Sequence, residues 1–229
     1  MRTLLPICAL TLACLLLTSL AVAAPAPERP DFPKWTRGSR PAEAFDAGTI
    51  WGSEPDGRGM VPTNQILTPA GRQVIFSQRA NDCAVSPDGR WLAVKGHLRL
   101  LLIDLATGAV AKDTPLPKSG NSYSGVLWSA DGKTLYNTGM GGDLYIGSLQ
   151  ADGTITWADP IAFKPRPPAQ NAVPVGMALS ADSSRLYVAL DGNNTVAEVD
   201  LTTRRVVREI DCDMLPYGVA LVGRKLYVT

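Results

Sequence analysis

The chain has 229 residues, of which 45% are hydrophobic and 19% charged, so it can bury the core of one substantial domain and is not disordered. Its formal net charge of +1 lacks the basic excess expected of a nucleic-acid-binding protein. The 21 glycines and 18 prolines follow no three-residue period, which excludes collagen and favours an all-β chain rich in turns.

The first 23 residues are predicted to be a secretory signal. Arg2 gives the start a positive charge, an apolar stretch follows, and Ala21-Val22-Ala23 is the small-x-small pattern at which such signals are cut. A retained membrane anchor is the alternative, because the stretch is about long enough to span a bilayer. Cleavage removes one basic residue and no acidic one, which leaves 21 of each and no net charge. We expect a secreted or periplasmic protein without a membrane span.

Cleavage would leave two of the four cysteines, Cys83 and Cys212. They could pair in an oxidising compartment, but we prefer to interpret them as two buried, unpaired thiols. The chain contains no Cys-x-x-Cys pair and only one histidine, so it has no zinc-binding pattern. No metal site and no cofactor are predicted.

A repeat of about 42 residues organises most of the chain. Its core is an apolar run, a turn with Asp-Gly or Asp-Ser at its centre and a second apolar run, as in residues 82–94, 125–137 and 176–188. A fourth, shorter copy occupies residues 218–228. Each full copy continues with two further apolar runs, each after a polar turn. Four antiparallel strands per repeat predict an all-β fold, a β-propeller of four-stranded blades.

The repeat also predicts the domain organisation. Residues 24–61 form an N-terminal linker rich in proline and glycine, and residues 62–229 form the propeller part. Blades are expected at about 82–124, 125–175 and 176–217, with a stub at 218–229.

The two ends of the propeller part have complementary strand phases. Ile66–Thr68 and Gln73–Phe76 have the phase of third and fourth strands, so residues 62–80 are expected to be the outer strands of the closing blade. The stub has the phase of first and second strands. We therefore expect a fragment of about three and a half blades, incomplete as a propeller and forming an open arc.

One end of the predicted blades is a candidate binding face. In a propeller, the second-to-third-strand turns and the connections between blades emerge on the same face, which here includes a proline-rich insertion at 163–174. Converging polar and aromatic groups suit a ligand or a protein partner, whereas ordinary loop polarity is the alternative. The candidate ligand-binding residues are Asp82, Lys95, His97, Tyr123, Asp191 and Tyr217.

No catalytic arrangement is apparent. A Ser–His–Asp triad would have to use His97, which lies in a predicted turn, and there is no Gly-x-Ser-x-Gly sequence. Asp211-Cys212-Asp213 could hold a metal, but a loop between blades explains it better. Arg204, Arg205 and Arg208 form a small basic spot at an outer turn, where exposed charges discourage edge pairing.

The last repeats carry a family resemblance. LYVALDGNNTVAEVDLTTRRVVREI at 186–210, followed by PYGVALVGRKLYVT at 216–229, resembles the YVTN-type (YncE-like) propeller repeat. PTNQILTPAGRQVIF at 62–76 is similar to the lead-in of a subgroup in which the propeller precedes an alkaline-phosphatase-like phosphoesterase domain. The family generally closes seven blades, so the resemblance implies that further blades, and any such domain, would lie beyond residue 229.

Two functions follow as hypotheses. The first is an exported, non-catalytic binding module that takes an unknown protein or small molecule on its loop face, and no nucleic acid. The second, which the resemblance implies, is the N-terminal propeller portion of a phosphoesterase or lactonase-like hydrolase whose catalytic residues lie outside this chain.

Overall fold

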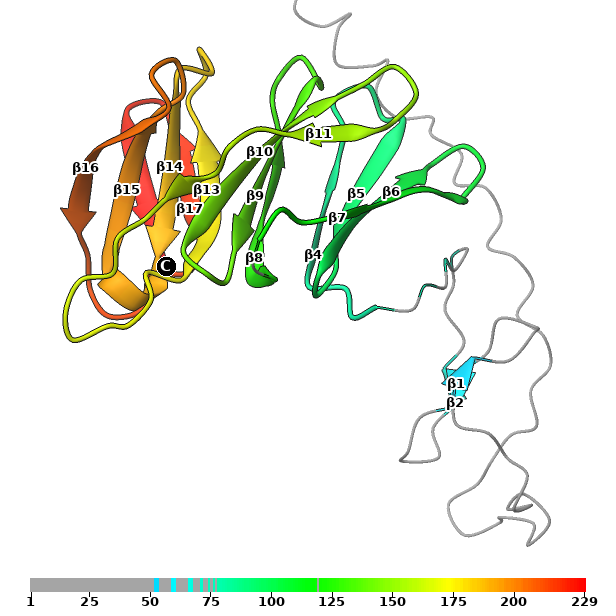
Figure 1. Ribbon diagram of the computed structural model, residues 1–229, viewed down its shortest axis with the longest axis horizontal. Helices are drawn as coiled ribbons and strands as arrows, with labels where there is room; N and C mark the ends of the chain where they lie inside the picture. The colour runs from blue at the N-terminus through cyan, green and yellow to red at the C-terminus, as the bar shows by residue number, and fades with distance from the viewer. Residues whose placement is uncertain are drawn as a thin grey trace, which may run out of the picture. The chain divides into compact units, whose positions relative to one another are not determined.

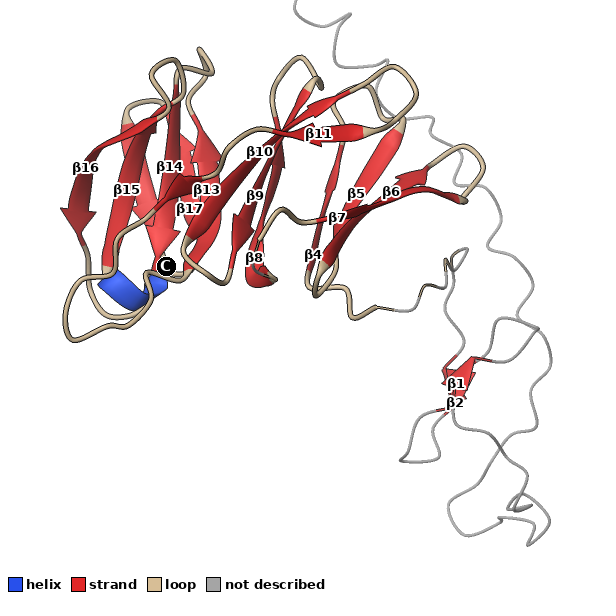
Figure 2. Cartoon of the chain, in the orientation of Figure 1, coloured by secondary structure: helices blue, strands red, loops and turns tan. Residues whose placement is uncertain are grey.

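The computed structural model describes residues 52–53, 59–60, 66–67, 71, 74, 76, 78–118 and 120–229. The predicted signal at 1–23 lies outside the described residues, as does most of the predicted linker. The chain divides into two units, Met1–Gly52 and Ser53–Thr229, and all the repeats lie in the second. Figure 2 shows strands joined by loops throughout the described part, with one short helical turn, η2 (Asp191–Asn193). None of the described helical segments is long and apolar enough to cross a membrane.

Three antiparallel blades follow one another in chain order (Figure 1). Blade 1 consists of β4 (Asp82–Val85), β5 (Trp91–Lys95), β6 (Arg99–Asp104) and β7 (Val110–Pro115). Blade 2 consists of β8 (Asn121–Trp128), β9 (Thr134–Gly139), β10 (Asp143–Leu149) and a fourth strand in two pieces, β11 (Ile155–Trp157) and β12 (Ile161–Ala162). Blade 3 consists of β13 (Pro174–Leu179), β14 (Arg185–Leu190), β15 (Thr195–Asp200) and β16 (Arg205–Asp211).

A half-blade of two strands, β17 (Val219–Val222) and β18 (Lys225–Val228), follows blade 3. The expected all-β fold of four-stranded antiparallel blades, three full and one half, is therefore confirmed. The innermost strands differ in length from the expected ones. β8 begins at Asn121 because it contains a bulge between Asn121 and Val126, and β13 has a similar irregularity between Pro174 and Met177.

Apolar side chains fill the spaces between neighbouring blades. Trp91 and Leu102 of blade 1 pack with Trp128 and Leu135 of blade 2 in one buried cluster. A second cluster joins blades 2 and 3 and includes Leu144, Ile146, Ile161, Phe163, Leu186, Val188, Leu190 and Val199. Indole groups add polar links, since Trp128 Nε1 donates to Ala84 O at 3.1 Å and Trp157 Nε1 donates to Pro115 O at 3.1 Å. Trp91, Trp128 and Trp157 therefore take part in the packing and hydrogen bonding of blades 1 and 2.

A small sheet precedes blade 1. β3 (Ile66–Leu67) pairs with β2 (Gly59–Met60), and β1 (Gly52–Ser53) completes this sheet. The described residues Val74 and Phe76 lie outside strands. They pack against Val94, Leu101 and Ile103, so they cover the apolar outer face of blade 1 without extending its sheet.

A Ser-x-Asp motif closes the first hairpin of each full blade. In blade 1, Ser86 Oγ donates to Asp88 Oδ1 at 2.5 Å and accepts from the Trp91 N–H at 2.9 Å. The motif recurs as Ser129 with Asp131 and as Ser180 with Asp182, at 2.6 Å in both. These hydrogen bonds hold the pKa of each aspartate below its ordinary value. The repeat predicted the aspartate at the centre of each turn, and the serine that is hydrogen-bonded to it is an addition from the structure.

Candidate functional site

The loop face is the end of the blades that carries residues 96–98, 140–142, 163–173, 191–194 and 212–218 together with the bulge of β8. Five large apolar side chains are exposed on it: Leu98, Tyr123, Met214, Leu215 and Tyr217. Their exposed fractions run from 45% for Tyr217 to 80% for Met214. A gathering of exposed apolar side chains on one face is typical of a surface that binds a partner.

The six predicted ligand-binding residues do not all reach the surface. His97 and Tyr123 are exposed, as is Tyr217, and Asp191 is half-buried at the start of η2. Asp82 and Lys95 lie opposite each other in the β4–β5 pair, where Lys95 is fully buried. The structure therefore brings Asp82 and Lys95 together, and it distributes the other four over separate connections.

The Lys95 ammonium joins blade 1 to blade 2. Its Nζ donates to Ser122 Oγ at 3.0 Å, Ser124 O at 2.6 Å, Gly125 O at 3.0 Å and Thr138 Oγ1 at 2.7 Å. Burial lowers the pKa of Lys95 to about 7, against an opposing effect of the Asp82 charge. The side chain has no exposed surface, so its observed contacts are internal to the protein.

Asp82 holds the same bulge of β8 from the other side. Its Oδ2 accepts from the Gly125 N–H at 2.8 Å and from Ser124 Oγ at 3.3 Å. Asp82 accepts hydrogen bonds from the bulge, and Lys95 donates hydrogen bonds to it. Together the two residues hold the backbone beside Tyr123, whose side chain is exposed on the loop face.

Blade 3 contacts the same group of residues, since Thr138 Oγ1 donates a hydrogen bond to Val175 O at 3.4 Å. Gly125, which lies beside this contact, has a φ of +96°. A Cβ atom at position 125 would lie 2.1 Å from Val175 O and 2.4 Å from Thr138 Oγ1. Only glycine fits this backbone and this space. We call Asp82, Lys95, Ser122, Ser124, Gly125 and Thr138 the three-blade junction.

Sequence reasoning missed the blade 2 members of the junction. The available signal was the run of small polar residues Asn121–Gly125 directly before the predicted inner strand. Asn121 has a related role, because its Nδ2 donates to Gly96 O at 2.7 Å and its N–H donates to His97 O at 2.8 Å. These bonds fix the turn that carries His97.

The proline-rich insertion is anchored at both ends. Phe163 N–H donates to Gly142 O at 2.7 Å, and Asp191 N–H donates to Val173 O at 3.0 Å. Between them, Arg166 pairs with Glu209 at 2.9 Å and with Asp211 at 2.6 Å. The predicted extended loop is therefore a strap that runs from blade 2 to blade 3, and we call residues 163–173 the strap.

The two cysteines are unpaired, but Cys83 is exposed and Cys212 half-buried. The expectation of a buried Cys83 is wrong because the residues of β4 alternate between half-buried and exposed. This innermost strand therefore packs on one face only. Within the described part of the chain, no group of three or more histidine, cysteine and acidic residues could hold a metal ion.

Comparison with solved structures assigns the fold. The chain is similar to the periplasmic gluconolactonase of Pseudomonas aeruginosa, with a TM-score of 0.57 and 21% identity over 66% of this chain and 47% of that one. It is also similar to hydrazine synthase of Kuenenia stuttgartiensis (TM-score 0.53, 19% identity, 69% and 44% coverage). A protein of unknown function from Desulfotomaculum acetoxidans gives a TM-score of 0.55 at 13% identity, with 72% and 52% coverage. No family model and no curated protein match the sequence.

These similarities identify the fold as that of a β-propeller and the chain as a propeller module. The chain spans about half the length of the solved structures that it matches.

Proposed function

We propose that the chain is an exported β-propeller binding module of the YVTN-type repeat family, which binds a protein or small molecule through its loop face. The observation that carries the proposal is the set of exposed apolar side chains on this face, two of them tyrosines. Tyrosine supplies a large contact area and a polar group at a low entropic cost. The junction and the strap hold the surrounding backbone in place, which reduces the cost of ordering it on binding.

Site-specific photo-crosslinking tests the binding face. A photoreactive amino acid replaces Tyr123 or Tyr217 in the full chain, which is produced in its own host and irradiated there. The matched control carries the same amino acid at Val207, which is 54% exposed on β16 and outside the loop face. We expect a discrete adduct from both tyrosine positions and none from position 207. Equal adducts from all three positions, or none from either tyrosine position, would contradict the proposal.

A hydrolase is the second candidate, favoured by the similarity to a gluconolactonase and by the repeat resemblance. The catalytic residues would then lie outside this chain. We predict that the purified chain hydrolyses neither gluconolactone nor phosphomonoesters, and that His97→Ala changes no measured rate, because His97 is exposed and its turn is held through its backbone carbonyl. Turnover by the wild-type chain that is lost in His97→Ala would contradict the non-catalytic binding module and would place a catalytic residue within this chain.

Export is tested separately. We predict that protein recovered from the periplasm or the culture medium begins at Ala24, because the signal pattern ends at Ala23. N-terminal sequencing reads this directly. An intact Met1 on membrane-bound protein would instead support the retained anchor.

A further inference from the structure

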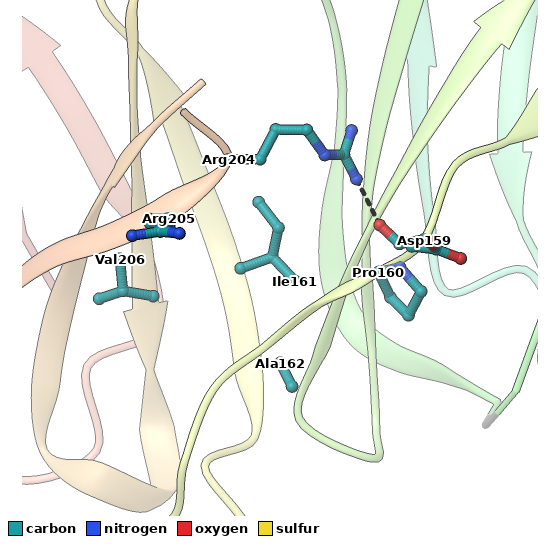
Figure 3. Close-up of a pocket in the computed structure, with 7 residues that line it drawn as sticks. All are labelled: Asp159, Pro160, Ile161, Ala162, Arg204, Arg205 and Val206. Atoms are coloured by element: carbon teal, nitrogen blue, oxygen red, sulfur yellow. Dashed lines mark hydrogen bonds between the residues drawn. The ribbon is translucent and has the colours of Figure 1, made fainter. Parts of the chain in front are cut away.

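A hollow of about 540 Å³ lies between blades 2 and 3 and is lined by none of the residues that define the loop face (Figure 3). Asp159–Ala162 of the broken fourth strand of blade 2 form one wall. Arg204–Val206, at the β15–β16 turn and the start of β16, form the other wall. Proline, isoleucine, alanine and valine side chains line the hollow beside the charged ones, so a ligand would meet apolar and charged surface together.

The break in the fourth strand creates this hollow. Trp157 lies opposite Gly147 and Ile161 lies opposite Leu144, so the outer strand contains one more residue than β10 across the same interval. The extra residue displaces the backbone at Asp159-Pro160 outward. An Arg204 guanidinium N–H donates to the Asp159 carbonyl oxygen, which fixes the displaced segment to blade 3 (Figure 3).

The hollow has a net positive charge, because Arg204 and Arg205 line it with a single carboxylate, that of Asp159. The bond from Arg204 goes to a neutral carbonyl, and no carboxylate of the described residues forms an ion pair with Arg204 or Arg205. Arg208, by contrast, pairs with Glu198 at 2.7 Å. Figure 3 shows the Asp159 side chain on the side of the hollow away from Arg205. Arg205 and Arg208 are exposed, as expected of solvated edge charges, and Arg204 is half-buried.

The wall from blade 2 also presents a free strand edge. Phe163 N–H donates to Gly142 O at 2.7 Å, and hydrogen-bonded pairs alternate along an antiparallel ladder. Leu144 and Ile161 are therefore a hydrogen-bonded pair, whereas the Ala162 N–H and C=O point away from β10. Ala162 is exposed and its peptide groups are available to another strand.

We propose that this hollow binds an extended acidic peptide, which pairs with the edge of β12 at Ala162 and places a carboxylate beside Arg204 and Arg205. Strand addition explains the free edge, and the arginine pair selects acidic side chains. The apolar residues of the hollow accept the alternate, uncharged side chains of the same peptide. The site is separate from the loop face, so it stands whether or not the loop face binds a partner.

Fluorescence anisotropy with the full chain tests this site. The probe is a fluorescein-labelled heptapeptide that alternates valine with glutamate, and its counterpart replaces each glutamate with lysine. We expect saturable binding of the glutamate peptide that weakens as salt is added, and no binding of the lysine peptide. Absence of saturable binding at low salt, or equal binding of both peptides, would overturn the proposal.

Charge variants locate the binding. We expect Arg205→Glu to weaken binding at least ~10-fold, because it replaces the attracting charge with a repelling one. Arg224→Glu, in the exposed β17–β18 turn, makes the same change outside the hollow and should alter the Kd by less than about 2-fold. Asp159→Asn should tighten binding, since it removes the one carboxylate of the hollow. Equal effects of the two arginine variants would overturn the assignment.

A proline variant tests the strand pairing. Ala162→Pro removes an N–H that points away from β10, so it should keep the fold and weaken binding at least ~10-fold. The matched control is Ala181→Pro, in the turn whose counterpart in blade 1 already holds Pro87. Thermal unfolding midpoints establish that both variants fold. A folded Ala162→Pro variant that binds like the wild type would overturn strand addition.

Discussion

Lys95 has an unusual environment for an ammonium group. Four neutral oxygens surround it, and its charge is buried with Asp82 as the one acidic group that acts on it. These interactions offset only part of the free energy that is needed to remove the charged ammonium from water. The lowered pKa of Lys95 is the measurable consequence of the remaining cost.

We predict that the stability of the chain rises with pH above neutrality. The pKa of Lys95 is about 7 in the folded state and near its ordinary value of 10.5 in the unfolded chain. Between these two pKa values the unfolded chain binds more protons than the folded one. Raising the pH therefore increases the folding equilibrium constant, by up to about tenfold per pH unit. Below pH 7, Lys95 is protonated in both the folded and the unfolded state. Its contribution to stability is then at its minimum and no longer changes with pH.

Urea unfolding between pH 6 and pH 9.5 measures this effect. Lys95→Met should remove most of the rise above pH 7, whereas Lys133→Met, on an exposed turn, should retain it. A flat wild-type profile, or a rise that persists in Lys95→Met, would contradict the assigned pKa.

Ser183 provides a second residue-scale test. It has a φ of +57° at the position that Gly89 and Gly132 occupy in the other blades. A left-handed backbone conformation costs free energy for any residue with a Cβ atom. We therefore expect Ser183→Gly to stabilise the chain by ~1 kcal/mol. Gly132→Ala should destabilise it by a similar amount. The midpoint of urea unfolding measures the stability of both variants. A loss of stability in Ser183→Gly would contradict the cost assigned to the backbone conformation of Ser183.

At the scale of elements, the strap holds its shape through contacts with blade 3. Arg166→Ala removes its pairs with Glu209 and Asp211. We expect faster amide exchange within residues 163–173 and a change in global stability below ~1 kcal/mol, because exposed ion pairs contribute little. The control is Lys164→Ala, because Lys164 is an exposed neighbour that forms no ion pair with the described residues. Unchanged exchange in Arg166→Ala would mean that the backbone bonds alone hold the strap.

The strands of each blade could be predicted because local pattern determines them. Apolar runs separated by turn residues predicted four strands in each full blade, and β14, β15 and β16 follow that pattern. The bulges of β8 and of the β11–β12 strand could not be predicted, since they arise where one blade meets the next. Lys95 illustrates the same limit. Beside Gly96 and His97 it resembles a loop residue, and only the bulge of the following blade buries it.

At the scale of the molecule, two kinds of contact join the blades. Apolar clusters fill the spaces between sheets, and the three-blade junction adds polar contacts at the loop face. Apolar packing tolerates many sequences, whereas a buried polar network requires a particular geometry. We infer that the junction sets the relative positions of blades 1, 2 and 3 at the end where binding is proposed.

The three-blade junction couples three blades and thereby organises the loop face. Hydrogen–deuterium exchange of the full chain, wild type against Lys95→Met at pH 7, tests this coupling most directly. We expect faster exchange in β8 and β13 as well as in β4 and β5. We expect little change in β16, since none of the hydrogen bonds of the junction described above involves it. Faster exchange confined to β4 and β5, with β8 and β13 unchanged, would contradict this coupling.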